Sequence, residues 1–179
     1  RKIEWDNLSM MPSDGAIDLL RANRSEINWE RLSKNPNDGA VDLLRANQHK
    51  IYWHNLSANL NPNAMDLLKD NKHKIECMYL SSNRSDGAME LLKANPNRIY
   101  GYNLSRNPSD GAMKLLKANP NKIDWDGLSY NRSDGAMELL KANPGKDKID
   151  WKELSYNPSD EAIELLKANP GKDKINWER

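Results

Sequence analysis

The sequence predicts an all-α protein, an α-solenoid of seven repeats of 24–26 residues, each with one long and one short helix. Two observations support this prediction: a frame of fixed period, and an apolar spacing within the frame that fits helices. The frame reads I-x-W-x-x-L-S-x-N-P-S-D-G-A-M-E-L-L-K-A-N-P-x-K. Its copies begin at Ile3, Ile27, Ile51, Ile75, Ile99, Ile123 and Ile149, and a truncated copy begins at Ile175. Such a period is typical of arrays whose units bury their apolar faces against their neighbours. We therefore expect residues 1–179 to form a single elongated array, as a fragment of a longer protein.

The longer segment of each repeat is predicted to be a helix of about three turns, as in residues 12–23. Ala16, Ile17, Leu19 and Leu20 have the spacing of one helix face. Several copies open this segment with Asn-Pro, and we expect Asn to cap the helix and Pro to take its first position. These pairs are Asn35-Pro36, Asn107-Pro108 and Asn157-Pro158.

Charged residues and a closing asparagine mark the two ends of this helix. An acidic residue falls in the first turn of most copies and a basic residue in the last, as the helix dipole favours. The acidic residues are Asp14, Asp38, Asp86, Asp110, Asp134 and Asp160, and the basic residues are Arg21, Arg45, Lys69, Lys93, Lys117, Lys141 and Lys167. The closing residues are Asn23, Asn47, Asn71, Asn95, Asn119, Asn143 and Asn169. Because Asn tolerates the left-handed conformation, we expect it to terminate each helix in that conformation.

The second segment of each repeat is predicted to be a short helix with its own cap. Asp124 is the expected N-cap, which puts Ile123 and Leu128 at the spacing of a hydrophobic staple. Asp150 and Glu153 have the spacing of a capping box. Corners of a few residues join the helices, and Gly145-Lys146-Asp147 and Gly171-Lys172-Asp173 lengthen two of the junctions.

A leucine-rich repeat is the main alternative, because its period can also be 24 residues and it also keeps an Asn. The frame L-x-x-L-x-L-x-x-N matches at Ile123, Leu128 and Asn131 but fails at its second leucine. That position holds Asp6, Glu30, His54, Asp126 and Lys152. The helical interpretation accounts for more of the pattern.

Two motifs resemble short tandem repeats of uncharacterised proteins of large DNA viruses of algae and amoebae. They are Asn61-Pro62-Asn63-Ala64-Met65-Asp66-Leu67-Leu68 and the recurring K-I-D-W-x-x-L-S-x-N, and the resemblance covers nearly the whole chain. It implies an α-helical repeat array, with no catalytic residues to transfer. Most copies depart from it by reading Pro-Ser-Asp-Gly-Ala where that family reads Pro-Asn-Ala. We interpret this as two added residues at the start of the long helix, with only the copy at Pro62 in the shorter form.

Composition favours an intracellular protein, cytoplasmic or associated with a virion. The net charge is +1, from 27 Lys and Arg against 26 Asp and Glu, so nothing draws the whole chain to a nucleic acid or a membrane. Cys77 is the single cysteine, which excludes an internal disulfide framework. No apolar run approaches the ~20 residues that cross a bilayer.

No pattern in the sequence predicts a cofactor, a metal site or catalysis. His49 and His73 lie one repeat apart, with His54 and Cys77 nearby in the sequence. Zinc needs three or four ligands that converge at ~2.0–2.3 Å, and positions one repeat apart are too distant for this. We therefore expect no metal and no enzyme activity.

Positions that vary from repeat to repeat are the candidates for recognition. They lie on the short helix and the corner after it, where the variable residues are rich in Tyr and Arg. Such residues often anchor protein interfaces, although plain solvent exposure also explains variation. The candidate partner-binding residues are Tyr52, Tyr79, Tyr100, Tyr102, Arg106, Tyr130 and Tyr156.

The tryptophan column is interrupted in the middle of the array. Trp5, Trp29, Trp53, Trp125, Trp151 and Trp177 share one position, which holds Cys77 and Gly101 in the fourth and fifth copies. If the indole is part of a packed core, its loss costs ~3–5 kcal/mol unless the space is refilled. Either Tyr79, Tyr100 and Tyr102 compensate, or a groove opens there.

The function predicted from these patterns is a non-catalytic scaffold that binds a protein partner or packs with neighbouring subunits of an assembly such as a virion. The alternative is a helical array that binds nucleic acid. A basic column precedes the Ile of each repeat, at Lys2, Lys50, Lys74, Arg98, Lys122, Lys148 and Lys174. Acidic columns run beside it and reduce its field, so we expect nucleic-acid binding less than protein binding.

Overall fold

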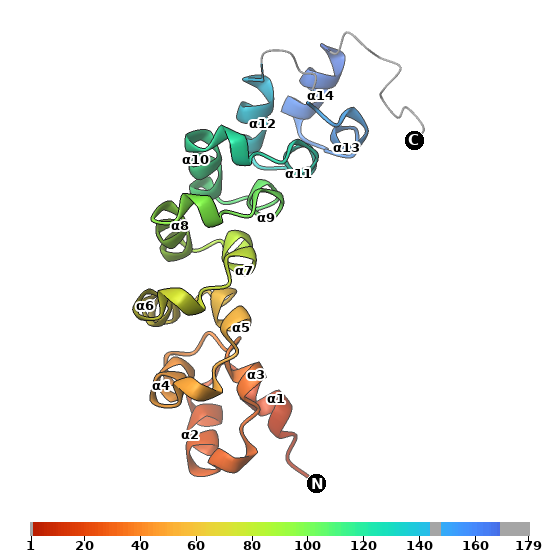
Figure 1. The fold of residues 1–179 in the computed structure, drawn as a ribbon. Coiled ribbons are helices and arrows are strands. Elements are labelled where there is room, and N and C mark those ends of the chain that lie inside the picture. The colour runs from red at the N-terminus through yellow and green to blue at the C-terminus, as the bar shows by residue number, and fades with distance from the viewer. Residues whose placement is uncertain (1, 144–147, 169–179) are drawn as a thin grey trace. The chain divides into compact units, whose positions relative to one another are not determined.

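The computed structural model describes residues 2–143 and 148–168, and every regular element in this part of the chain is a helix (Figure 1). The long helices are α2 (Asp14–Ala22), α4 (Asp38–Ala46), α6 (Pro62–Asp70), α8 (Asp86–Lys93), α10 (Asp110–Ala118), α12 (Asp134–Lys141) and α14 (Asp160–Lys167). The short helices are α1 (Trp5–Met10), α3 (Trp29–Leu32), α5 (Trp53–Ser57), α7 (Cys77–Ser82), α9 (Gly101–Ser105), α11 (Trp125–Tyr130) and α13 (Trp151–Leu154).

The prediction of an all-α array with alternating long and short helices is confirmed for the described residues. The solenoid form and the single array over residues 1–179 stay predictions. The truncated copy at Ile175, Asn169, Lys174, Trp177 and the inserted residues of both long junctions lie outside the described residues.

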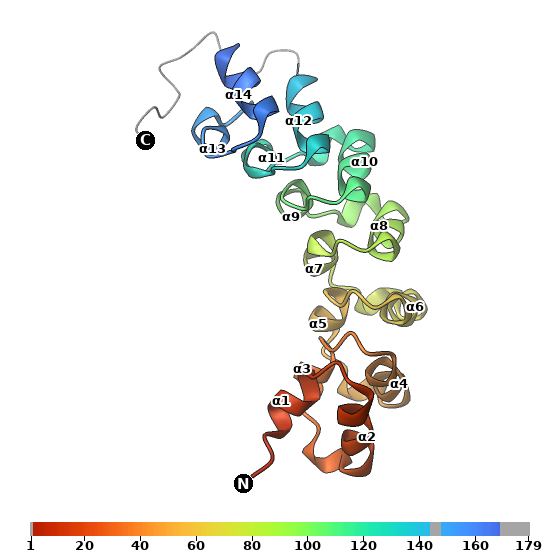
Figure 2. The same ribbon diagram turned by 180° about the vertical axis from the view of Figure 1, so that it is seen from behind.

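The helices group into two compact units, residues 1–91 and residues 92–179. In the N-terminal unit α2 packs on α4 and α4 on α6, while α1 packs on α3 and α5 on α7. In the C-terminal unit α10, α12 and α14 pack in succession, and so do α9, α11 and α13. Each unit therefore has a layer of long helices and a layer of short helices, which both views show (Figures 1 and 2).

The core of each unit lies between its two layers. The Ala and the second Leu of the A-x-x-L-L stretch are buried in every described repeat, as the predicted helical stripe requires. The Leu of the Leu-Ser pair is fully buried in nearly all short helices, from Leu32 to Leu154. Burial of such a side chain stabilises the fold by about 1.5–3 kcal/mol relative to exposure. The apolar positions that the frame keeps constant are therefore packing positions.

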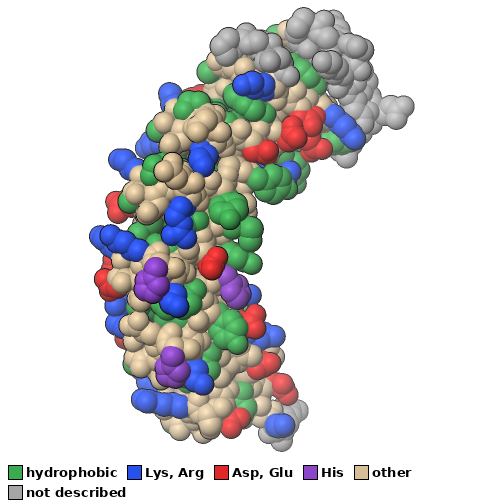
Figure 3. Space-filling view, viewed as in Figure 1, with side chains coloured by type: hydrophobic (Ala, Val, Ile, Leu, Met, Phe, Trp, Pro, Cys, Tyr) green, Lys and Arg blue, Asp and Glu red, His purple; other side chains and the backbone are tan. Residues whose placement is uncertain are grey.

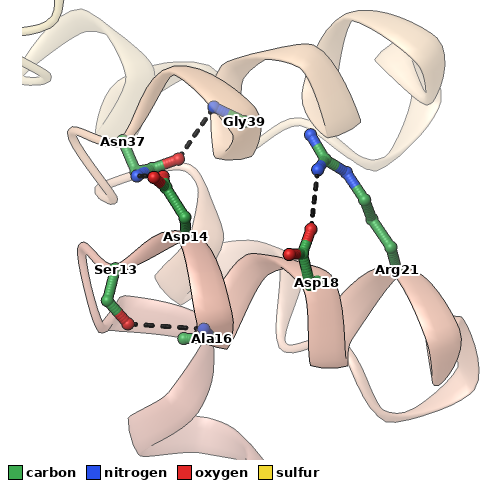
Figure 4. Close-up of polar contacts among 7 residues, drawn as sticks. All are labelled: Ser13, Asp14, Ala16, Asp18, Arg21, Asn37 and Gly39. Atoms are coloured by element: carbon green, nitrogen blue, oxygen red, sulfur yellow. Dashed lines mark hydrogen bonds and ion pairs between the residues drawn. The ribbon is translucent and has the colours of Figure 1, made fainter.

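The long helices begin two residues later than the Asn-Pro pairs predicted. Their N-caps are Ser13, Asn37, Ser109, Ser133 and Ser159, whose side chains accept hydrogen bonds from backbone N–H groups of the first turn. Figure 4 shows Ser13 accepting from Ala16 N, Asn37 accepting from Gly39 N, and Asn37 Nδ2 donating to Asp14. The assignment of Asn35, Asn107 and Asn157 as N-caps is therefore wrong. The predicted acidic first turn and basic last turn are confirmed.

The copy at Pro62 is not shortened. Helix α6 has nine residues, as α2, α4 and α10 have, and Pro62 takes the first position with Asn61 as its cap. Asn61 corresponds in register to Asn37 of the preceding repeat, and Pro62 corresponds to Asp38. This is a true Asn-Pro cap, and the interpretation that the other copies add two residues is wrong.

The long helices end differently from the prediction. Asn23, Asn47, Asn71 and Asn119 have φ between −136° and −122°, which is not the left-handed region. Each side-chain amide donates instead to the carbonyl four residues earlier, at 2.8–2.9 Å, so it satisfies a carbonyl at the end of the helix. A single 3-10 turn then follows, which the sequence analysis did not predict. These turns are η1 (Arg24–Glu26), η2 (Gln48–Lys50), η3 (Lys72–Lys74), η4 (Pro96–Arg98) and η5 (Pro120–Lys122).

The Asn of the Leu-Ser-x-Asn motif joins each repeat to the one before it. In Asn59, Nδ2 donates to the carbonyls of Ser33 and Asn35, and Oδ1 accepts from the backbone N–H of Asn61, all at 2.9–3.1 Å. The same pattern recurs at Asn35, Asn83 and Asn131, and these side chains are buried. We call this series the asparagine ladder. It satisfies backbone groups that burial would otherwise leave unpaired.

The Ser of the same motif makes a second connection between repeats. Ser129 Oγ donates to the carbonyl of Trp125 and accepts from the backbone N–H of Asp150 in the next repeat. The predicted caps of the short helices are confirmed at Asp124 and Asp150, and Asn28 caps α3 in the same way. In a complete capping box the Asp150 N–H would donate to the Glu153 side chain, but here it donates to Ser129 Oγ. Only the other hydrogen bond of the box, from Glu153 N–H to Asp150 Oδ1, is formed.

A glycine lets successive long helices approach closely. A Cβ on Gly135 would lie 2.8 Å from Met113 Cγ, and a Cβ on Gly87 would lie 2.9 Å from Met65 Cγ. Gly15 occupies the same position in the first repeat, and a Cβ there meets nothing within 4 Å. At Gly87 and Gly135 the glycine thus lies close against the preceding long helix, whereas α6 and α14 carry Asn63 and Glu161 at this position. Gly15 offers an internal control.

We predict that Asn131→Ala lowers the free energy of unfolding by about 2 kcal/mol or more, because two carbonyls and one N–H lose their partner in a buried place. Urea denaturation followed by circular dichroism measures this change. Asn121→Ala is the matched control, since Asn121 lies exposed in η5 of the same unit. Equal effects of the two substitutions would show that the asparagine ladder does not hold repeats together.

We predict that Gly135→Val destabilises the protein by about 1–3 kcal/mol, the usual cost of an extra group in a packed interface. Gly15→Val carries the same change in helix propensity without the steric overlap, and its effect should be much smaller. Thermal melting of both variants separates packing from propensity. Matching melting temperatures would contradict the close-approach explanation.

Candidate protein-interaction surface

The candidate partner-binding residues lie on the short helices or directly beside them, and all are exposed. The tyrosines have 38–56% of their surface exposed, although Tyr is an amphipathic residue that interiors readily accommodate. In Figure 3, hydrophobic side chains come to the surface along the short-helix layer of each unit. We call these residues the short-helix surface. It comprises Tyr52, His54 and Tyr79 in the N-terminal unit, and Tyr100, Tyr102, Arg106, Tyr130 and Tyr156 in the C-terminal unit.

In the N-terminal unit, an imidazole lies between two tyrosine rings. Tyr52 is the N-cap residue of α5, His54 is on α5, and Tyr79 is on α7. The His54 ring meets Tyr52 edge to face at a centroid distance of 6.0 Å and lies tilted against Tyr79 at 5.4 Å. These distances are in the favourable range for aromatic pairs. The packing of α7 on α5 therefore assembles one aromatic cluster from two repeats.

A cleft adjoins this cluster in the N-terminal unit. It has a volume of about 540 Å³ and lies between the start of α3 and the start of α5, beside η2. Trp29, Glu30, His49, Lys50 and Tyr52 are among the residues that line it. The lining thus combines aromatic residues with residues of both charges.

In the C-terminal unit, a guanidinium lies between two tyrosine rings. Arg106 Cζ is 4.6 Å from the centroid of Tyr102 and 4.9 Å from the centroid of Tyr130. Both distances fall within the ~6 Å range of cation–π attraction, which contributes about 0.5–1 kcal/mol at an exposed site. Tyr102 comes from α9 and Tyr130 from α11, while Arg106 directly follows α9. Packing of α11 on α9 thus brings the three side chains together.

Gly127 makes room for Arg106. A Cβ on Gly127 would lie 2.6 Å from Asp124 Oδ2, 3.2 Å from Arg106 Cγ and 3.4 Å from Ser105 Cβ. The position corresponds to Asn103 in the preceding repeat and to Glu153 in the next, so other repeats carry a side chain there. The missing side chain leaves room for the arginine stem beside α11.

Tyr100 and Tyr156 extend the exposed aromatic area in the C-terminal unit. Tyr100 is the N-cap residue of α9, and Tyr156 follows α13 by two residues. All seven candidates therefore occupy the layer on which the sequence analysis placed them. Their role in binding stays a prediction.

The tryptophan column does not behave as a buried core. Trp5, Trp29, Trp53 and Trp125 are half-buried, and only Trp151 of the described column is fully buried. Lys148 covers the ring of Trp125, with Nζ 5.7 Å from its centroid. Losing an indole here therefore removes less buried area than the sequence analysis assumed.

Neither explanation for the interruption of this column is correct. Tyr79, Tyr100 and Tyr102 are exposed, so they do not refill a core position. Cys77 is itself buried, and at Gly101 a Cβ would overlap the carbonyl oxygen of Lys122 in η5. The backbone of the next repeat occupies the space beside Gly101, so no groove opens there.

The described residues contain no group of three or more His, Cys, Asp or Glu side chains that could hold a metal ion. Of the helices in residues 2–143 and 148–168, none has the length and apolar character needed to cross a membrane. Comparison with protein-family models, curated proteins and solved structures finds no match to this chain.

Sequence reasoning did not single out His54 or Gly127 as contributors to this surface. His54 was named near the possible metal ligands and at the second-leucine position of the leucine-rich frame, but not as a candidate for binding. The signal for His54 was its place at the same repeat position as Tyr102, a candidate already named. The signal for Gly127 was weaker: its repeat position carries a side chain in the two neighbouring repeats, Asn103 and Glu153, but not here.

We predict that Gly101→Ala destabilises the protein by about 1–3 kcal/mol, because the new Cβ meets backbone that cannot rotate away. Helix propensity alone favours alanine by up to about 1 kcal/mol, so the two effects have opposite signs. Gly15→Ala, with open space around it, should be neutral or stabilising. Chemical denaturation of both variants measures the difference. A stabilised Gly101→Ala variant would contradict the close approach of η5.

Proposed function

We propose that this protein is a non-catalytic scaffold that binds a protein partner through its short-helix surface. One observation supports the proposal most directly: two clusters, each assembled from adjacent repeats, keep tyrosine rings exposed around an imidazole or a guanidinium. Tyr and Arg are the residue types that contribute most to binding energy in protein interfaces. Side chains that already contact one another in the free protein also lose less conformational entropy on binding than freely rotating side chains do.

The backbone beneath these side chains supports the same proposal. The asparagine ladder and the Ser connections fix the short helices relative to one another within each unit. Binding groups held on rigid elements keep their spacing without a partner, which favours recognition of an extended segment that spans repeats.

We predict that Tyr102→Ser/Tyr130→Ser weakens partner binding by about tenfold or more, the effect expected when interface anchors are removed. The wild-type chain and this variant are immobilised in parallel, exposed to lysate of the source cells, and compared by quantitative mass spectrometry. Lys114→Ser/Glu138→Ser is the matched control, because both residues are exposed on the long helices of the same unit. Circular dichroism checks that each variant is folded.

The same experiment tests the nucleic-acid alternative. Binding to phosphates weakens steeply with salt, and nuclease treatment would abolish capture of material bridged by RNA or DNA. We expect capture that survives nuclease treatment and moderate salt. Equal capture by the wild type and the tyrosine variant would contradict a role for the short-helix surface.

A further inference from the structure

We infer that Arg106 is a specific anchor for a carboxylate on the partner, so that the C-terminal unit recognises a protein segment with an Asp or Glu side chain beside apolar residues. This inference rests on the proposed function and names the chemistry of the ligand at one point of the surface. The geometry of the Tyr102–Arg106–Tyr130 cluster is its starting point.

The two rings restrict the arginine before any partner arrives, and Gly127 leaves room for its stem. The rings lie at 4.6 and 4.9 Å from Cζ, and the stem passes over the place where Gly127 lacks a Cβ. The guanidinium lies over the rings and donates no hydrogen bond to the described residues, so its N–H donors stay available for other acceptors. Those donors form a fork that matches the two oxygens of a carboxylate.

The arginine is not neutralised within the described part of the chain. Arg106 takes part in none of the ion pairs of the described residues, which include Arg21 with Asp18, Arg45 with Asp70 and Lys141 with Glu164. No hydrogen bond from its guanidinium to residues 2–143 or 148–168 is present either, and the side chain is exposed. A permanent positive charge held in place without an acidic partner is complementary to an incoming carboxylate.

The surroundings favour a single carboxylate over a polyanion. Asp124 is the N-cap residue of α11 and its Oδ2 accepts a hydrogen bond from the backbone N–H of Gly127, while Asp126 directly precedes that glycine. A nucleic acid or a run of acidic residues would bring several negative charges close to these carboxylates, whereas one carboxylate on Arg106 avoids them. The exposed rings of Tyr102 and Tyr130 provide apolar area for the neighbouring side chains of the segment.

The test begins with a displayed library of random short peptides, selected against the intact chain. Peptides that bind wild type but not Tyr102→Ser/Tyr130→Ser identify ligands of this surface. We expect most of them to contain an Asp or Glu. For one such peptide, exchange of that residue for Asn or Gln should weaken binding to wild type by about tenfold.

The decisive measurement is a double-mutant cycle. The same peptide exchange should have little effect on binding to Arg106→Gln, because the anchor is already absent, and a full effect on Arg132→Gln, a control arginine exposed in the same unit. Arg106→Lys should also weaken binding, since an ammonium cannot supply the bidentate fork.

Peptides that need the tyrosines but show no acidic preference, or an acidic residue whose effect persists in Arg106→Gln, would overturn the carboxylate anchor and leave the proposed function standing. Selection of no peptide that depends on the tyrosines would count against both. Binding of a single-stranded RNA oligonucleotide that is lost in Arg106→Gln would also overturn the inference, because the ligand would then be a phosphate backbone.

Discussion

A buried side-chain amide sets the relation between neighbouring repeats in each unit. The asparagine of the Leu-Ser-x-Asn motif has 0–4% of its surface exposed at Asn35, Asn59, Asn83, Asn131 and Asn157. At most of these positions it donates to two carbonyls of the preceding repeat and accepts from its own backbone two residues later. Hydrogen bonds of this kind tolerate only small changes of distance, and an unmade bond in a buried place is costly. Successive repeats therefore cannot slide past one another by a residue, and the packing of the short helices follows from this register.

The surface chemistry depends on that register. Arg106 meets Tyr130 because the residues after two successive Leu-Ser pairs are held side by side. His54 meets Tyr79 because α5 and α7, which carry them, pack against each other. A substitution in one repeat can thus make room for a side chain of the neighbouring repeat. Gly127 lacks a side chain at the place where the stem of Arg106, from the preceding repeat, lies. The constant positions pack the repeats together, and variable residues from adjacent repeats contact one another to form a surface with a defined arrangement of rings and charge. The proposed binding site therefore depends on adjacent repeats and not on any one of them.

Departures from the frame have physical explanations in the neighbouring repeat. Gly101 replaces a tryptophan where the η5 backbone comes close, and Asn157, which follows a lengthened junction, donates to the carbonyl of Asn131 and contacts the sulfur of Met137 at 3.9 Å. Helix α6 starts with Pro62 in place of the usual Asp and keeps its length, because Asn61 supplies the same cap as the serines elsewhere. An interface tolerates such changes when the neighbouring chain adjusts to fill the space and satisfy the polar groups.

The sequence alone determined the helical class, the core stripe, the caps of three short helices and the layer that carries the exposed tyrosines, because these follow from local spacing within one repeat. It misplaced the start of the long helices, since an Asn before a Pro looks like a cap. The Asn that persists before Leu60, Arg84 and Arg132, with no Pro after it, already indicated another role. Only the tertiary structure showed that this Asn binds carbonyls of the preceding repeat, that the η5 backbone lies close to Gly101, and that Arg106 contacts two tyrosine rings. The physical reason is that each depends on atoms about one repeat apart in the chain, and the distance between them is set by packing and not by local propensity.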